Sequence, residues 1–211
     1  MRTRIVTLAL TAALVACGLS LSSARLDAAS PATFAVNSVL DEVDKKPGDG
    51  ICKSKPSRKC TLRAAIMEAN ARPGKDKIIL RAGTYLLTRA GENEDKGATG
   101  DLDFKSNLTL VGRGAATTII DADSNDRVAH ILRGKVKLSK LTLTHGAGIY
   151  NPDGYGGGIY IARDAKLTLD QAVLTLNAAD SYASIRGWEP HQGQPVPVLF
   201  FQRLLRRAGI A

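Results

Sequence analysis

A loose repeat constrains the fold of this chain more than any other feature of its sequence. The segments NLTLVG at Asn107, KVKLSK at Lys135 and AKLTLD at Ala165 share one pattern, in which polar and apolar residues alternate before a turn. Their spacings of 28 and 30 residues are typical of solenoids. In a solenoid each coil buries its inward side chains and packs on its neighbours, so we expect a stack of short strands.

The repeat favours an all-β fold, a right-handed parallel β-helix, over a β-sandwich. Antiparallel sandwiches join longer strands by tight two-residue turns such as Asn-Gly. Such turns are missing from this chain, in which Gly, Asp, Asn and Ser separate very short apolar strands. We therefore expect parallel β-helix coils over residues 76–179, with a β-sandwich as the alternative.

One compact helix signal interrupts the strand pattern, in CTLRAAIMEANA at residues 60–71. Thr61 is placed to act as the N-cap, and a Pro-Gly pair follows the segment. A helix of about nine residues is not stable alone, so we expect it to pack on the first coil, with Arg63 and Glu68 off its apolar stripe. The residues at i, i+3, i+4 and i+7 that form this stripe are Leu62, Ala65, Ile66 and Ala69.

The first 30 residues resemble an export signal. Two arginines precede an apolar run from Ile5 to Ala16, and small residues at Ser22–Ala24 offer a cleavage site. The run is too short for a membrane span, which needs about 20 residues, and no other stretch is a better candidate. The sequence LVAC at residues 14–17 keeps a second interpretation open, a lipobox in which Cys17 is lipidated.

Export would place the mature chain in an oxidising compartment, either outside the cell or in the cell envelope. The two cysteines that remain there are Cys52 and Cys60, and we expect them to form a disulfide. The closed loop of about nine residues is worth roughly 2.6 kcal/mol in the chain-entropy model. A metal site built on these cysteines is not expected, because no histidine lies nearby in the sequence.

The net charge of +9 at pH 7 bears on the partners of the chain. The basic residues are spread along the sequence, and no Lys/Arg block is interleaved with aromatic residues. This pattern indicates either a solvated basic surface or attraction to acidic polysaccharides and anionic envelope surfaces. Nucleic acid is not an expected partner of an exported chain.

The segment CTLRAAI, residues 60–66, resembles the Cys-Ser-Leu-Arg-Glu-Ala motif of the CSLREA domain of secreted bacterial β-helix proteins. Thr61 stands in place of the Ser and Ala64 in place of the Glu. Further segments resemble the family in the family's order: DEVDKKPGDGICKS, IILRAGTYLLT, GDLDF, LTLVGRGAATTIIDA and GGGIYI. The resemblance covers about residues 33–179 and implies a pectin-lyase-like β-helix. It also implies that residues 31–75 form an N-terminal cap whose short helix covers the open end of the coils.

Acidic residues are the candidates for chemistry, because the β-helix fold includes enzymes that act on polysaccharides. Asp101 and Asp103 alternate at i and i+2, so on a strand they would share a face, as a hydrolytic pair requires. A polar loop is the simpler interpretation of this segment. Asp121, with Asp123 and Asp126, predicts either a calcium or saccharide loop or a set of Asx turns that cap a coil.

A further acidic group lies in DEVDKKPGDG and makes calcium the one cofactor to consider. Its members are Asp41, Glu42, Asp44 and Asp49. Carboxylate oxygens are the ligands that Ca²⁺ prefers, although their spacing does not match an EF-hand loop. His130, in the apolar segment VAHIL, is expected to be an edge or core histidine, and His145 a turn residue.

Residues 180–211 depart from the strand pattern. They hold the only Trp and end on a basic apolar segment. Val198–Ile210 can form an amphipathic helix, which would either cap the fold or bind a membrane surface. Alternatively, the whole segment is the out-of-frame end of a longer gene.

No acidic group in the sequence forms a recognisable active site. The leading hypothesis is therefore a secreted or surface-attached, non-catalytic β-helix protein that is adhesive, structural or glycan-binding. A calcium-dependent polysaccharide lyase or glycoside hydrolase acting on acidic polysaccharides is the first alternative. The second alternative is the front end of a larger β-helix adhesin.

Overall fold

The computed structural model describes residues 30–91, 94–148, 156–179 and 185–187. In these residues the chain forms one helix, α1 (Leu62–Asn70), and parallel β-strands, as expected for an all-β protein. The strands are β1 (Thr33–Ala35), β2 (Lys75–Ile79), β3 (Gly83–Leu86), β4 (Leu102–Phe104), β5 (Asn107–Val111), β6 (Thr118–Asp121), β7 (Ala129–Ile131), β8 (Gly134–Ser139), β9 (Thr142–Thr144), β10 (Ile159–Ile161), β11 (Ala165–Asp170), β12 (Val173–Thr175) and β13 (Ile185–Gly187). The export signal with Cys17 and the amphipathic segment Val198–Ile210 lie outside the described residues.

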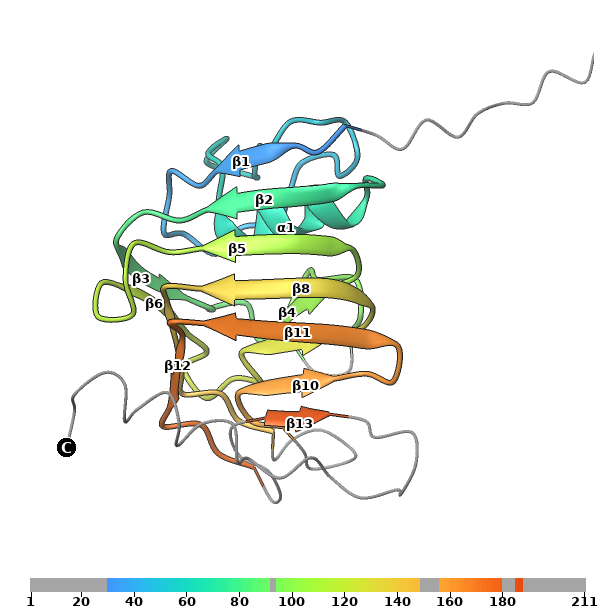
Figure 1. The fold of residues 1–211 in the computed structure, drawn as a ribbon. Helices are drawn as coiled ribbons and strands as arrows, with labels where there is room; N and C mark the ends of the chain where they lie inside the picture. Colours follow the sequence, from blue (N-terminus) through green and yellow to red (C-terminus); the bar gives the residue numbers. More distant parts are fainter. Residues whose placement is uncertain (1–29, 92–93, 149–155, 180–184, 188–211) are drawn as a thin grey trace, which may run out of the picture.

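The strands form three sheets, with the orders β1-β2-β5-β8-β11, β12-β9-β6-β3 and β13-β10-β7-β4. From β2 onward the chain visits the sheets in a fixed order, and each strand pairs with the strand three places later along the chain. We call three successive strands, one from each sheet, a circuit. Figure 1 shows the five-stranded sheet in front, with its strands stacked one above another. All pairs between the described strands are parallel, whereas a β-sandwich is built from antiparallel sheets.

The strand register reproduces the sequence repeat, but its third segment is shifted by one residue from the alignment that the sequence pattern suggests. Leu110 pairs with Leu138, and Leu138 pairs with Leu169, so matching positions are 28 and 31 residues apart. Ala165, the first residue of the third segment, pairs with Gly134 rather than with Lys135. The physical reason is the turn before β11, which is one residue longer than the turn before β8.

The core lies between the three sheets and is built from matching positions of successive circuits. Ile78, Leu110 and Leu138 follow one another in register, and each is fully buried. On the second sheet, Ile120 and Leu143 are paired and buried in the same way. Removing such a side chain from water stabilises the fold by about 1.5–3 kcal/mol, so the ladders of aliphatic residues hold the circuits together.

Helix α1 packs against one end of this core and contacts β2 and β4. Thr61 caps it, because its hydroxyl oxygen accepts a hydrogen bond from the N–H of Ala64 at 3.2 Å. The structure buries the whole apolar stripe of the helix, which consists of Leu62, Ala65, Ile66 and Ala69. The expected disulfide joins Cys52 to Cys60, the residue before the N-cap, and so fixes the position at which the helix begins.

Asn70, the last residue of α1, hydrogen-bonds to backbone groups along the free edge of β4. The Asn70 amide nitrogen donates to the carbonyl of Asp103 at 2.7 Å, and its amide oxygen accepts from the N–H of Lys105 at 2.8 Å. These two hydrogen bonds replace those of a neighbouring strand at the edge of the β13-β10-β7-β4 sheet. An edge covered in this way does not pair with a second chain.

Strand β13 was not expected from the sequence, because it lies in the segment after residue 179. Its residues pair in parallel with β10, with Ile185 opposite Ile159. At least one strand beyond residue 179 therefore continues the sheet.

In the described residues, no helix is long and apolar enough to cross a membrane.

Candidate functional site

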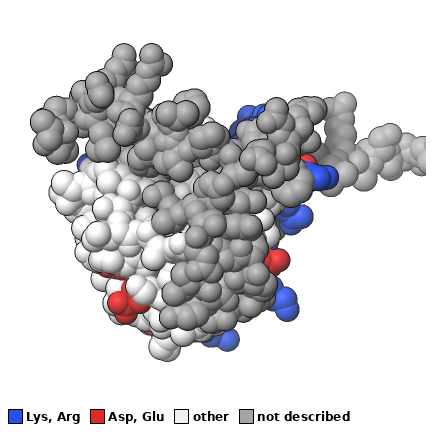
Figure 2. Space-filling view, turned by 90° about the horizontal axis from the view of Figure 1, so that it is seen from below, with Lys and Arg blue, Asp and Glu red and all other residues white. Residues whose placement is uncertain are grey.

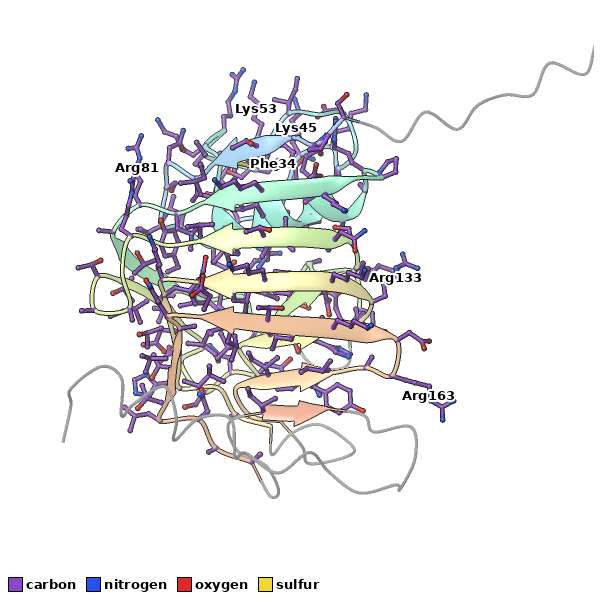
Figure 3. The ribbon with its side chains drawn as sticks, viewed as in Figure 1. Phe34, Lys45, Lys53, Arg81, Arg133 and Arg163 are labelled. Atoms are coloured by element: carbon purple, nitrogen blue, oxygen red, sulfur yellow. A yellow bond between two sulfur atoms is a disulfide. The ribbon has the colours of Figure 1, made fainter. Side chains whose placement is uncertain are left out.

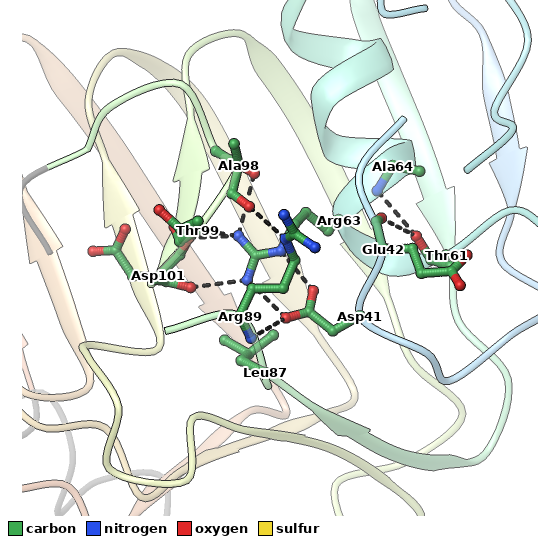
Figure 4. Close-up of polar contacts among 12 residues, drawn as sticks. Asp41, Glu42, Thr61, Arg63, Ala64, Leu87, Arg89, Ala98, Thr99 and Asp101 are labelled. Carbon is green, nitrogen blue, oxygen red and sulfur yellow. Dashed lines mark hydrogen bonds and ion pairs between the residues drawn. The ribbon is translucent and has the colours of Figure 1, made fainter. Parts of the chain in front are cut away.

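Two charged residues of α1 lie off its apolar stripe, and the structure buries both of them. Arg63 is 1% exposed, and its Nε donates to Asp41 at 2.5 Å (Figure 4). Glu68 is 0% exposed and accepts hydrogen bonds from the backbone N–H groups of Gly48 and Gly50. The remaining Arg63 donors bind four carbonyl groups, those of Gly97, Thr99, Gly100 and Asp101.

These contacts make Arg63 and Glu68 structural residues of the cap. Arg63 joins α1 to the loop that precedes β4, and Glu68 joins α1 to the loop that precedes the disulfide. Gly100 fits this arrangement because its φ is +60° and a Cβ would lie 2.3 Å from the carbonyl oxygen of Gly91. A substrate does not reach either charged group, since both are enclosed by the protein.

The structure does not gather the calcium candidates of the cap into one site. Asp41 binds Arg63, and Asp44 accepts from the N–H groups of Lys46 and Lys53 at 2.7 and 2.9 Å. Asp49 accepts from the N–H of Ile51 in a local turn. Glu42 accepts from the hydroxyls of Ser54 and Ser57, and these hydrogen bonds, Ser54 first, lower its pKa. Each carboxylate therefore organises the cap loop.

The second acidic group, after β6, divides into a turn and a buried contact. Asp121 accepts from the N–H of Asp123 at 2.9 Å, which is the Asx turn considered for this segment. Asp121 also lies 3.0 Å from Nδ1 of His145, a turn residue with a φ of +51°. Asp126 is buried and accepts from the backbone N–H of Asp101 at 3.3 Å, so it holds the chain at the start of β4.

Asp101 and Asp103 are buried beside β4 rather than exposed in a polar loop. Asp101 is 3% exposed and pairs with Nε of Arg127 at 3.1 Å. Burial raises its pKa to about 7, the charge of Asp126 adds to the rise, and Arg127 opposes it. Asp103 is 0% exposed, and burial, followed by the charge of Asp101, raises its pKa to about 8. Two such enclosed carboxyl groups do not meet a sugar ring.

A polar row crosses the outer face of the sheet that contains β4. Asp103 on β4, His130 on β7 and Tyr160 on β10 are neighbours in register. The rings of His130 and Tyr160 meet edge to face, with centroids 5.1 Å apart, and the guanidinium of Arg127 lies over the Tyr160 ring. Asp95, from the loop before β4, reaches within 3.7 Å of His130 Nδ1. The sequence alone did not predict that these residues lie together, because their proximity depends on the register between β4 and β7.

A different row of side chains covers the outer face of the five-stranded sheet. In register order across the strands this row is Thr33, Lys77, Thr109, Lys137 and Thr168. A second row beside it consists of Lys75, Asn107, Lys135 and Lys166. We call these nine residues the lysine–threonine face. The alternation in KDK, NLT, KVK and KLT predicts outward polar residues, but the alignment of the lysines appears only with the strand register.

The charge of the lysine–threonine face is mostly uncompensated. Lys137 forms an ion pair with Asp170 at 2.9 Å, and both side chains are about half exposed. In the part of the chain that the structure describes, none of the other four lysines of the face forms an ion pair. Arg133 and Arg163 lie in the turns before β8 and β11 (Figure 3), at the end of the sheet where Lys135 and Lys166 are the second residues of these strands. Figure 2 shows basic side chains, with acidic side chains among them, along the right-hand edge of the molecule, the side on which these turns lie.

The outer face of the β12-β9-β6-β3 sheet differs in chemistry. Its matching outward positions carry Thr84, Ile119, Thr142 and Val173 in one row, and Leu86, Asp121, Thr144 and Thr175 in the next. These two rows contain no lysine or arginine. Lysines therefore occupy the outward rows of the five-stranded sheet but not those of the β12-β9-β6-β3 sheet.

Comparisons of this chain with protein-family models, with curated proteins and with solved structures found no match. The functional conclusion therefore depends on the chemistry of the faces described above. Of these, the lysine–threonine face is charged and mostly exposed, whereas the acidic candidates are enclosed or engaged by the protein itself.

Proposed function

We propose that this protein is a non-catalytic binder of acidic polysaccharides and that the lysine–threonine face is its binding surface. The observation that carries the proposal is the alignment of five lysines in two register rows of one sheet, two on β2, two on β8 and one on β11. Neighbouring strands lie about 4.8 Å apart, so the row from Thr33 to Thr168 is roughly 19 Å long. Such a row matches an extended polymer better than a small molecule.

The residue types of the face fit a charged sugar chain. Lysine ammonium groups pair with carboxylate or sulfate groups, and exposed pairs of this kind are individually weak, so several must act together. The hydroxyls of Thr33, Thr109 and Thr168 and the amide of Asn107 can exchange hydrogen bonds with sugar hydroxyls. The rows hold no aromatic residue on which a nucleic-acid base would stack. This set favours acidic polysaccharide over single-stranded nucleic acid.

The fold that we infer for this binder is a right-handed parallel β-helix with a CSLREA-type cap. The fixed order in which the chain visits its three sheets supports it, as does the strong preference of parallel crossovers for the right hand. The contacts of the CTLRAAI segment also support it, since Leu62 enters the core and Arg63 binds the loop before β4. Export to the envelope or the exterior remains part of this proposal, in keeping with the disulfide.

The burial of Asp101 and Asp103 supports binding without cleavage. Glycoside hydrolysis needs two carboxyl groups on either side of the scissile bond, in contact with the sugar. With 3% and 0% exposure, these side chains offer no such contact. A lyase or hydrolase remains the competing hypothesis, and the absorbance of unsaturated uronates detects cleavage by a lyase.

Binding to polygalacturonate tests the proposal directly. The variant Lys75→Glu/Lys135→Glu/Lys166→Glu is expected to bind about 10–100-fold more weakly than wild type in calorimetric titrations at low salt. The matched control is Lys45→Glu/Lys55→Glu/Lys59→Glu, which makes the same charge change at exposed positions of the cap. The control should retain most of the affinity, and wild-type binding should weaken as salt screens the charges.

Equal losses in the two triple variants would contradict the proposal, because they would show general charge attraction rather than a defined face. No binding by wild type would contradict it as well. The same samples should show no rise in the absorbance of unsaturated uronates with or without Ca²⁺. Such a rise would establish the lyase instead.

A further inference from the structure

Three side chains with metal-binding atoms converge beside β4, away from the lysine–threonine face. They are Asp95, Asp103 and His130, and one potential ligand atom from each lies within 4.8 Å of the other two. His130 Nδ1 is 3.7 Å from Asp95 Oδ1 and also 3.7 Å from Asp103 Oδ1. The group joins a loop to two neighbouring strands, because Asp103 and His130 are opposite each other on β4 and β7.

Asp103 supplies an independent observation that points to a missing partner. Its side chain is 0% exposed, and neither carboxylate oxygen has a hydrogen-bond partner. An unpartnered buried carboxylate is costly, and native proteins rarely keep one without an ion or a functional role. The guanidinium of Arg127 is engaged elsewhere, because it pairs with Asp101 and lies over the Tyr160 ring.

We propose that Asp95, Asp103 and His130 bind a divalent transition-metal ion, with Zn²⁺ as the best fit. Imidazole nitrogen suits zinc and its neighbours in the first row, whereas Ca²⁺ takes six to eight oxygen ligands. Two carboxylates and one imidazole make three protein ligands, and a water molecule completes a tetrahedral zinc site. This site goes beyond polysaccharide binding and does not depend on it.

The distances and exposures agree with such a site. Zinc bonds to nitrogen and carboxylate oxygen are about 2.0–2.2 Å long, so two ligands of one ion lie about 3–4 Å apart. The two 3.7 Å separations already fall within this range. Asp95 is 66% exposed and His130 12% exposed, so an ion can enter from solvent on the Asp95 side and reach the enclosed Asp103.

Metal titration of the full chain tests the site. Wild type is expected to bind one Zn²⁺ in competition with a chromophoric chelator, and Co²⁺ is expected to give visible d–d bands from mixed nitrogen and oxygen ligands. Asp95→Asn and His130→Gln should each weaken Zn²⁺ binding by about 10–100-fold and remove the Co²⁺ bands. Asp95→Asn changes an exposed side chain, so it leaves the fold intact even if variants of the buried Asp103 unfold.

A second Asp–His pair in the protein provides the matched control. His145 lies 3.0 Å from Asp121 on another sheet, with its side chain 44% exposed. His145→Gln should leave zinc affinity unchanged. Zinc binding that survives Asp95→Asn and His130→Gln, or that is lost in His145→Gln, would overturn the proposal. So would the absence of zinc binding at micromolar concentration by folded wild type.

Discussion

The variant Arg63→Ala is expected to lose about 3–5 kcal/mol of unfolding free energy, the largest effect among single substitutions in the cap. Arg63 is 1% exposed and pairs with Asp41, whose side chain is 2% exposed. Removing the guanidinium leaves the Asp41 carboxylate buried and without a counter-charge, although the backbone N–H of Arg89 still donates to it at 3.1 Å. It also removes the donor for the carbonyls of the loop that precedes β4. A loss of this size is a large part of the total stability of a small domain.

Urea unfolding followed by circular dichroism measures this loss. Arg113→Ala is the control, because Arg113 is an exposed arginine outside the cap and its removal should change stability by less than about 0.5 kcal/mol. The double variant Arg63→Met/Asp41→Leu should regain part of the loss, since it leaves no buried charge without a partner. A loss below about 1 kcal/mol in Arg63→Ala would show that Arg63 does not hold the cap on the first circuit.

Acidification from pH 8 to pH 5 is expected to stabilise this protein by roughly 6 kcal/mol in metal-free buffer. Burial raises the pKa of Asp101 to about 7 and of Asp103 to about 8, whereas an unfolded Asp has a pKa of about 3.9. Between about pH 3.9 and these raised pKa values, the two carboxyl groups are protonated in the folded state and ionised in the unfolded state. The stabilisation that these two groups contribute is therefore complete below about pH 4 and is lost as the pH rises toward 8.

The surroundings of the two carboxyl groups define the pH window. The groups around them that carry charge are Arg63, Glu94, Asp95, Lys105, Asp126, Arg127 and His130. The pKa of Glu42 and of Glu94 is lowered, so both remain ionised at pH 5, and their contributions are lost only at lower pH. The window from pH 5 to pH 8 therefore lies above the range in which these two glutamates titrate.

Urea midpoints at four pH values in this window measure the effect, with a chelator present. Asp103→Asn removes one titrating group while keeping His130, so its stability should change with pH about half as steeply as that of wild type. A stability that rises with pH in wild type would contradict the buried, protonated state of Asp103. An unchanged slope in Asp103→Asn would assign the effect to another group.

The helix, its N-cap residue Thr61 and the strands could be predicted because their sequence signals are local. Alternation identified the inward residues of β5 and β8, and the i, i+3, i+4 pattern identified the apolar face of α1. The burial of Arg63 and Glu68 could not be predicted in this way. Their partners come from loops around residues 48–50 and 97–101, which close over α1 only in the folded chain.

The candidate sites required the strand register, which the sequence specifies only indirectly. Asp103 could be placed on a possible strand, but its neighbour His130 is 27 residues away and meets it only through the pairing of β4 with β7. The same holds for Lys135 and Lys166, whose alignment depends on one extra residue in the turn before β11. Local patterns therefore predict which residues face outward, and the register decides which of them act together.

The most direct test of the polysaccharide-binding claim is to map the ligand on the protein by two-dimensional ¹⁵N–¹H NMR during titration with oligogalacturonate. We predict shift changes concentrated on the outward residues of β2, β5, β8 and β11, with Lys77, Thr109, Lys137 and Thr168 among the largest. The amides of β3, β6, β9 and β12 should remain unchanged. Changes confined to the cap loop at residues 45–59, or to the β12-β9-β6-β3 sheet, would contradict the assignment of the lysine–threonine face as the binding surface.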